Sequence, residues 1–284
     1  MSNQDLIKKL KETKLYNEIL RNDVVKGEVF LAFRNNRIDF YYEGGKLFSF
    51  DHKGFSTHIK YASVIDTSDG KDDSIENYVT EEKLENYKLV SNFLKGIARI
   101  KENCKNYAGD EAKGVAEIYS KYSYLKSNKD IVVLDIEIAF EAKDRKGHDR
   151  IDILLLDKKN KNLIFVEAKH SLNKDLWSTT TPEVIKQINR YEQQIKMKEG
   201  AIKTKYCENI KLLNDLFEIE LPFPEKIDDK VILFIFGFDD DKKKGKLKRD
   251  VYEKKEYKGK MIYSKGDVSN IILGELIKSK NLNI

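Results

Sequence analysis

Two carboxylates and a lysine in the middle of the chain have a spacing suited to metal-assisted chemistry. Asp152 lies in an apolar run at 150–157, and Glu167 and Lys169 lie in a second run at 163–169. The five polar residues between the two runs are typical of a turn. The sequence therefore predicts an antiparallel hairpin that carries all three side chains.

The expected register of this hairpin brings the carboxylates together. If Asp157 pairs with Asn162, Asp152 lies directly opposite Glu167. Side chains alternate between the faces of a sheet, so Lys169 shares the face of both carboxylates. Like charges in opposed positions destabilise a strand pair, whereas Mg²⁺ is typically held by one or two carboxylates with water and phosphate oxygens. The pattern predicts a site for a hard divalent cation.

These residues resemble a known nuclease signature. Asp152 and the tripeptide Glu-Ala-Lys at 167–169 are similar to the motif of the PD-(D/E)XK superfamily, with Ile151 in the place of the proline. Gln187 and Tyr191, which follow in the family's order, resemble the QxxxY motif of its RecB-like branch. A charged hairpin with chance carboxylates is the plain alternative, and motif matches of this kind carry a false-positive risk.

The resemblance covers about residues 110–239 and implies hydrolysis of phosphodiester bonds with Mg²⁺, or with Mn²⁺ in its place. The catalytic residues that it implies are Asp152, Glu167, Lys169, Gln187 and Tyr191. The candidate metal ligands are Asp152, Glu167, the Ala168 carbonyl, Glu117 and Glu137. Proteins of this branch occur in DNA repair, restriction and defence against mobile elements, so we expect a role in defence or DNA processing.

Two of the candidate ligands come from elements that precede the hairpin. Glu117 lies in a helix expected at 110–126, where the family often has a carboxylate facing the metal, with Glu111 as the reserve. A solvent-facing Glu117 is at least as good an interpretation. Glu137 is central in a strand expected at 131–141.

Alternation along that strand makes one face acidic. It places Asp135 and Glu137 on one face and apolar residues, Val132 among them, on the other. An acidic face beside the two hairpin carboxylates would add to the metal site.

The segment that follows the hairpin supplies candidate contacts to substrate. Lys174 and Trp177 are placed to meet a phosphate and a base, although packing explains Trp177 equally well. A helix is expected from Pro182, and residues four apart share a helical face, as Gln187 and Tyr191 do. Arg190 is then free for a phosphate, and a surface pair of polar residues is the alternative for the motif.

The first part of the chain has a different pattern. A helix is expected at 2–22, a four-stranded antiparallel meander within 27–63 and a helix at 81–105. The strand segments are GEVFLAFR, RIDFYYEG, KLFSFDH and THIKYASV. Aromatic residues are concentrated in the meander, and we expect them to form its core rather than a stacking platform for single strands: Phe40, Tyr41, Tyr42, Phe48, Phe50 and Phe55.

The last part of the chain completes the expected core. Residues 231–238 form a continuous apolar run, which predicts a strand buried on both faces. Residues 200–230 indicate an irregular segment with a short helix at 210–217. The charge run at 239–249 is typical of a solvated loop, and its basic half would otherwise lie on a nucleic-acid backbone.

Composition limits the class of protein. The chain has 284 residues and a net charge of +5, from 53 Lys and Arg against 48 acidic residues, which permits a local nucleic-acid patch. Its two cysteines have no metal-site spacing, and there is no apolar signal segment. We expect a cytoplasmic protein with no membrane contact, whose partner is nucleic acid, DNA in the first place, with a homodimer left open.

These observations predict an α/β fold in two domains. A small α+β domain with the meander is expected at 1–105, and a restriction-endonuclease-like core, a mixed central sheet flanked by helices, at 106–284. The main alternative to a nuclease is a non-catalytic nucleic-acid-binding or sensing protein on the same scaffold.

Overall fold

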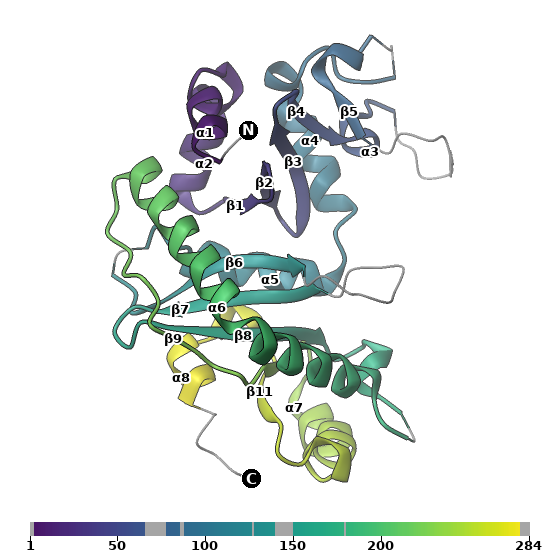
Figure 1. Cartoon of the computed structure of the whole chain (residues 1–284). Helices are drawn as coiled ribbons and strands as arrows, with labels where there is room; N and C mark the ends of the chain where they lie inside the picture. The colour runs from purple at the N-terminus through teal and green to yellow at the C-terminus, as the bar shows by residue number, and fades with distance from the viewer. Residues whose placement is uncertain are drawn as a thin grey trace. The chain divides into compact units, whose positions relative to one another are not determined.

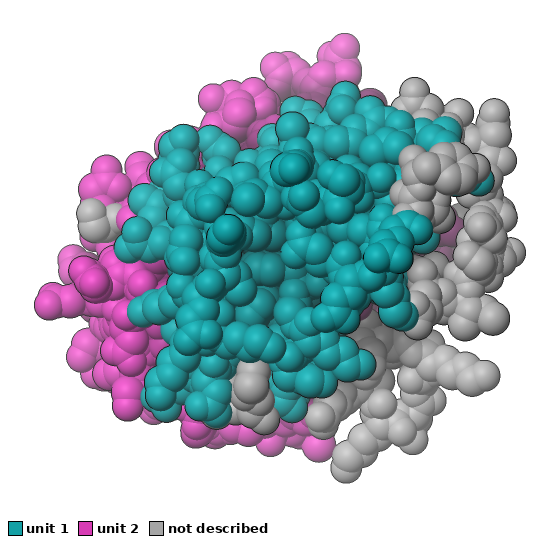
Figure 2. Space-filling view, turned by 90° about the horizontal axis from the view of Figure 1, so that it is seen from above, with its two compact units in different colours: residues 1–116 teal, residues 117–284 magenta. Residues whose placement is uncertain are grey.

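The chain forms two compact units, which Figure 2 distinguishes by colour. They comprise residues 1–116 (unit 1) and 117–284 (unit 2). The computed structural model describes residues 3–65, 78–85, 88–126, 128–139, 150–178 and 180–278. The division lies later than the boundary expected at 105/106, inside helix α5 (Asp110–Tyr122). The first turns of α5 contact unit 1, since a Cβ on Gly44 would lie 2.6 Å from the backbone of Ala112.

Unit 1 contains an antiparallel sheet in the order β1-β2-β3-β4-β5 (Figure 1). Its strands are β1 (Val29–Arg34), β2 (Arg37–Tyr42), β3 (Gly45–Asp51), β4 (Gly54–His58) and β5 (Tyr78–Thr80). Its helical segments are α1 (Asn3–Lys11), η1 (Tyr16–Leu20), α2 (Arg21–Lys26), α3 (Ile59–Ala62), η2 (Glu81–Lys83) and α4 (Phe93–Asn106), followed by α5. The expected meander is confirmed for its first three strands, and β5 adds a strand that was not expected.

Three boundaries in unit 1 differ from the expectation. The fourth strand was expected at 57–64, but β4 ends at His58, whose ring Nδ1 accepts a hydrogen bond from the Lys60 amide (3.2 Å) and so caps α3. The helix expected at 81–105 begins only at Phe93, because Asn92 caps it by accepting from the Lys95 amide (2.7 Å). The helix expected at 2–22 is divided among α1, η1 and α2.

The aromatic residues of the meander form the core of unit 1. Phe40, Phe48 and Phe50 are fully buried, and Phe55 is 7% exposed. The rings of Phe50 and Phe55 pack at 4.7 Å between centroids. The interpretation as core is therefore confirmed for these four rings, which present no stacking platform to solvent.

Unit 2 contains a mixed sheet in the order β11-β10-β8-β7-β6, with β9 paired to β8 (Figure 1). Strands β6, β7 and β8 are antiparallel, whereas β9 and β10 run parallel to β8 and β11 runs parallel to β10. The strands are β6 (Ile131–Ala139), β7 (Arg150–Asp157), β8 (Asn162–His170), β9 (Lys226–Ile227), β10 (Ile232–Phe236) and β11 (Met261–Lys265). The α/β class with a mixed sheet flanked by helices is confirmed.

The helical segments of unit 2 surround this sheet. They are η3 (Lys174–Leu176), α6 (Glu183–Phe217), α7 (Asp240–Lys242), η4 (Lys243–Tyr252), η5 (Lys255–Tyr257), η6 (Val268–Asn270) and α8 (Leu273–Lys278). In Figure 1, α6 runs across the strands β6 to β8.

Helix α6 is longer than the sequence suggested. An irregular segment with a helix only at 210–217 was expected, but α6 continues through a kink at Lys198 to Phe217. The reason is that buried residues recur at helical spacing beyond the kink, as at Ile202, Tyr206 and Ile210.

The charge run at 239–249 is helical rather than a loop. Asp239 caps α7 by accepting a hydrogen bond from the Lys242 amide (2.8 Å). Leu247 and Val251, four residues apart in η4, are 1% and 0% exposed. Two buried apolar residues thus anchor a helix whose other residues are mostly charged.

Candidate active site

The hairpin of β7 and β8 has the predicted register. The strands pair from Asp157 with Asn162 to Ile153 with Val166. The next position in this register sets Asp152 opposite Glu167, on the face that also carries Lys169. The register prediction is confirmed as far as the paired residues extend.

Lys169 and Glu167 form a buried ion pair. The Lys169 Nζ lies 2.7 Å from the Glu167 Oε1, and the two side chains are 8% and 1% exposed. Asp152 is half-buried, so it lies nearer to solvent than Glu167 does. The cluster thus contains the carboxylates of Asp152 and Glu167 and the ammonium of Lys169.

The Asp152 carboxylate is held against the end of β8. Its Oδ2 accepts a hydrogen bond from the Ala168 amide (2.7 Å). In an antiparallel ladder a residue directs its amide and its carbonyl to the same side. The Ala168 carbonyl, the expected third ligand, therefore faces the same side of β8 as the Asp152 carboxylate.

Gln187 and Tyr191 connect α6 to the strand that carries Asp152. The Gln187 Nε2 donates to the Tyr191 hydroxyl (2.8 Å), which donates to the Arg150 carbonyl (2.5 Å). Tyr191 is fully buried. The bond to Arg150 fixes β7 two residues before Asp152, so the motif residues position the site.

Strand β6 does not follow the expected alternation. Its register with β7 shifts between Val133 and Asp135, a β-bulge that puts Asp135 on the face of Val132. Asp135 is 2% exposed and accepts a hydrogen bond from the Tyr206 hydroxyl of α6 (2.9 Å). The expectation that Asp135 and Val132 lie on opposite faces is wrong, because an inserted residue reverses the alternation.

Glu137 and Glu117, the two further candidate ligands, do not complete a three-ligand metal site in the described part of the chain. Glu137 has a left-handed backbone (φ 52°) and forms an ion pair with Arg150 (3.3 Å). Glu117 is exposed on α5, and the reserve Glu111 is half-exposed and belongs to unit 1. Throughout the described ranges, no three His, Cys, Asp or Glu side chains are grouped so as to hold a metal ion.

The candidate substrate contacts have mixed outcomes. Lys174 is exposed in η3, as a phosphate contact requires. Arg190 was expected to be free, but it forms an ion pair with Glu183 (3.4 Å), which lies two turns earlier on the same side of α6.

Trp177 lies under a lysine that the motif analysis did not connect with it. The Lys246 Nζ is 3.8 Å from the centroid of the ring, and the Trp177 Nε1 donates to the Ser171 carbonyl (3.2 Å). Lys246 was visible in the sequence as part of the charge run, but no local signal relates it to Trp177. The Arg150 carbonyl was missed for a simpler reason, since a backbone acceptor has no sequence signature.

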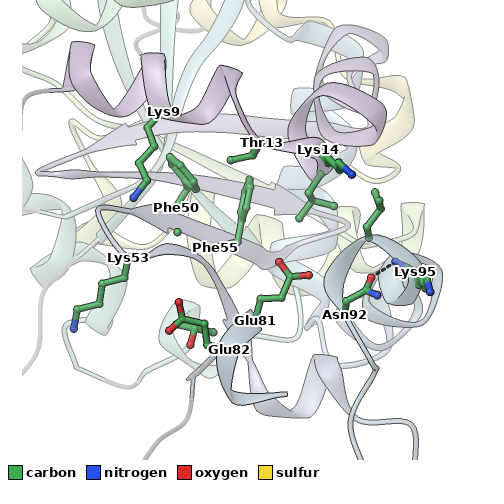
Figure 3. A pocket seen from close by; sticks show the side chains of 14 residues that line it. Lys9, Thr13, Lys14, Phe50, Lys53, Phe55, Glu81, Glu82, Asn92 and Lys95 are labelled. Carbon is green, nitrogen blue, oxygen red and sulfur yellow. Dashed lines mark hydrogen bonds between the residues drawn. The ribbon is translucent and has the colours of Figure 1, made fainter. Parts of the chain in front are cut away.

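Unit 1 contains a cavity of about 700 Å³ (Figure 3). Phe50 and Phe55 lie at its floor, and four lysines and two glutamates are among its lining residues. Two polar groups there bond to the backbone of unit 1: Lys9 donates to the His52 carbonyl (2.6 Å), and Asn92 caps α4. The cavity contains none of the candidate catalytic residues.

Comparison with known proteins identified no related family, protein or structure. A scan against protein-family models and searches of curated proteins and of solved structures found no match. In the part of the chain that the structure describes, every helix is too short or too polar to cross a bilayer.

Proposed function

We propose that unit 2 is a metal-dependent nuclease that hydrolyses phosphodiester bonds, in DNA in the first place. One observation carries the proposal: the β7–β8 ladder ends at Ile153 and Val166, one position before Asp152 and Glu167, where Asp152 accepts from the Ala168 amide (2.7 Å) and the Lys169 ammonium lies 2.7 Å from Glu167. A hairpin that served stability alone would avoid two opposed carboxylates. Defence or DNA processing is the biological setting we propose, and it rests on the motif resemblance.

The donor set of the cluster fits Mg²⁺, or Mn²⁺ in its place. Hard cations take oxygen ligands, and Mg²⁺ needs only one or two carboxylates when water and phosphate complete its shell. Asp152 and Glu167 would hold the ion, with the Ala168 carbonyl on the side of Asp152. Two neighbouring carboxylates supply the oxygen ligands that such a cation takes.

The residues of the chain then have separate tasks in hydrolysis. A bound Mg²⁺ supplies Lewis-acid polarisation of a phosphoryl oxygen. Lys169 donates to a non-bridging oxygen of the phosphate and stabilises the charge that grows there. Water adds to phosphorus and one P–O bond breaks, which leaves a phosphate monoester and a free sugar hydroxyl.

The QxxxY residues support this arrangement without reaching the phosphate themselves. Tyr191 bonds to the carbonyl of Arg150 and receives a hydrogen bond from Gln187. We assign to them the placement of β7, because a carboxylate that must hold a metal has to keep its position within a fraction of an ångström.

A non-catalytic nucleic-acid-binding or sensing protein is the second candidate. The observation in its favour is that the described residues contain no group of three metal-binding side chains. Such a protein would bind nucleic acid equally well with Mg²⁺ and with chelator and would leave every substrate intact.

The decisive assay uses the full chain with circular and linear, single- and double-stranded DNA and RNA, each with Mg²⁺, Mn²⁺ or chelator. We expect metal-dependent cleavage that Asp152→Asn and Lys169→Met abolish. Asp215→Asn, which changes an exposed carboxylate near the end of α6, is the matched control and should cleave at the parental rate. Equal cleavage by Asp152→Asn and the parent would refute the assignment.

A further inference from the structure

Strands β8, β10 and β11 of unit 2 are parallel, so their carboxyl ends lie at the same end of the sheet. In the parallel pairing of β8 with β10, Lys169 lies opposite Ile235 and His170 opposite Phe236. Phe236 in turn lies opposite Lys265 of β11. Segments that follow parallel strands leave from the same edge, which is where α/β sheets commonly bind ligands. Lys169, the last residue but one of β8, therefore lies near the end of the sheet from which the segment after β10 emerges.

That segment is α7, which begins with Asp240 and Asp241, followed by η4, which carries most of the basic side chains. Between positions 242 and 249 its basic side chains are all exposed: Lys242, Lys243, Lys244, Lys246, Lys248 and Arg249. Leu247 and Val251 are buried and hold η4 against the unit. The exposed basic side chains between positions 242 and 249 thus lie on a helical segment that two buried residues hold in place. We call the surface that these basic side chains form the basic ridge.

The basic ridge is attached to the segment that directly follows β8. Lys246 covers the ring of Trp177, and the Lys254 ammonium donates to the Ser178 carbonyl. The hydroxyl of Tyr257, just after η4, donates to the Leu176 carbonyl (2.9 Å). Trp177 is bonded back to Ser171, the first residue after β8. A short chain of contacts therefore joins the ridge to the strand that carries Glu167 and Lys169.

Part of the positive charge of the ridge is uncompensated. Lys248 has an acidic partner at 3.7 Å in Glu253, and Arg249 has one at 2.8 Å in Asp250. Among the described residues, Lys242, Lys243 and Lys244 take part in no ion pair. Exposed, unpaired lysines that bind phosphates displace the counterions condensed on the nucleic acid. The release of these counterions is the main source of affinity for a nucleic-acid backbone.

We propose that the basic ridge is the docking surface for the phosphate backbone of the nucleic acid that unit 2 cleaves. The proposal rests on the nuclease function, and it names the contact that delivers substrate to Asp152, Glu167 and Lys169. Contacts of lysine with phosphate fix position without reading sequence. Binding through such contacts should therefore be independent of sequence.

The test measures binding in an Asp152→Asn background with chelator, so that turnover plays no part. The variant Lys243→Gln/Lys244→Gln/Lys246→Gln removes three charges from the ridge. Its matched control, Lys159→Gln/Lys196→Gln/Lys211→Gln, removes three exposed charges elsewhere in unit 2. Anisotropy of a labelled DNA duplex and of single-stranded DNA gives the dissociation constant at several salt concentrations.

We expect the ridge variant to bind at least about tenfold more weakly and to lose about 2 to 3 from the slope of log affinity against log salt, since each phosphate contact contributes about 0.9. The control should stay near the parental values. The proposal is overturned if the ridge variant and the control bind alike, or if neither DNA form binds while vesicles of anionic lipid do. If DNA binding depends on the ridge but the parent cleaves nothing, the ridge stands and the nuclease function fails.

Discussion

Each unit of the protein buries a carboxylate, and the two environments differ. Asp39 in unit 1 is 1% exposed and lies within 3.0 Å of Arg37 and 3.7 Å of Arg34. It also accepts a hydrogen bond from the Ser49 hydroxyl (2.7 Å). Glu167 in unit 2 is fully buried, with the Lys169 ammonium 2.7 Å from its Oε1, and Asp152 accepts from the amide of the next residue, Ala168.

The comparison distinguishes Asp39, a carboxylate with a structural role, from Glu167, a carboxylate that we propose as a metal ligand. Around Asp39 the cations outnumber the acid, so its negative charge is fully compensated from within unit 1. Near Glu167 the structure places a second carboxylate, Asp152, beside the amide of Ala168. A buried charge is costly unless it is paired, so two neighbouring carboxylates at the end of β8 are the physical basis of the proposed metal site.

The largest expected effect is the loss of cleavage when the unit 2 cluster is changed. Lys169→Met should lower the rate of DNA cleavage by roughly 10²- to 10⁴-fold, the range for losing a transition-state or acid–base group. The double variant Glu167→Gln/Lys169→Met removes both buried charges together and should be as stable as the parent, because removing a whole pair is often neutral. Retained cleavage by a folded double variant would remove the basis for the comparison.

The corresponding change in unit 1 should affect stability alone. Asp39→Asn leaves two arginines without their carboxylate and should destabilise the fold by about 3 kcal/mol, as expected when one partner of a buried pair is removed. Urea unfolding gives this value, and Ser49→Ala, which removes only a neutral hydrogen bond, is the milder control. A loss of cleavage without a loss of stability would show that Asp39 has a role in activity after all.

A smaller effect separates the two buried tyrosine hydroxyls of α6. Tyr206→Phe removes a hydrogen bond to the buried Asp135 carboxylate, whereas Tyr191→Phe removes the part-buried bond to the Arg150 carbonyl and the bond accepted from Gln187. Each should cost about 1 to 3 kcal/mol of stability. Only Tyr191→Phe should also lower cleavage, by about tenfold, because it releases the strand that carries Asp152. Equal cleavage by the two variants would argue against a positioning role for Tyr191.

The smallest effect concerns pH and lies in unit 1. Burial, and then the charges of Lys60 and Lys46, lower the pKa of His58 below its ordinary value of 6.5. Because the pKa of His58 is lower in the folded than in the unfolded protein, the unfolded protein binds the proton more tightly. The contribution of His58 to folding stability is therefore complete above pH 6.5 and is lost as the pH falls towards the pKa of the folded protein. The neutral ring also accepts the amide of Lys60.

The loss should be well under about 1 kcal/mol because the ring is partly solvated. Melting curves between pH 7 and pH 5 would reveal it as a slope that His58→Gln reduces. A variant with the same slope as the parent would show that another group is responsible.

The sequence predicted the hairpin that carries the candidate site residues but not several of their contacts. The Asp152–Glu167 register followed from a polar turn and two alternating strands, which are local signals. The bulge before Asp135 could not be predicted, because it depends on how β6 meets β7 and on the hydroxyl of Tyr206. The stacking of Lys246 on Trp177 depends on the tertiary fold in the same way.

Some helix boundaries were missed for local reasons instead. The charge run at 239–249 was expected to be a loop because its charges outnumber its apolar residues, yet Leu247 and Val251 suffice to anchor a helix. In unit 1, the cap at Asn92 decides where α4 begins, and the apolar residues before it had suggested an earlier start.

Binding of Mn²⁺ tests the central claim most directly, because it needs no substrate. The signal of free Mn²⁺ in electron paramagnetic resonance falls as the ion binds, so a titration gives the affinity of the parent and of Asp152→Asn, Glu167→Gln and Asp39→Asn. We predict saturable binding to the parent and to folded Asp39→Asn, and at least about tenfold weaker binding to the two unit 2 variants. Binding that survives both Asp152→Asn and Glu167→Gln, or a parent that takes up no Mn²⁺ at millimolar concentration, would contradict the account.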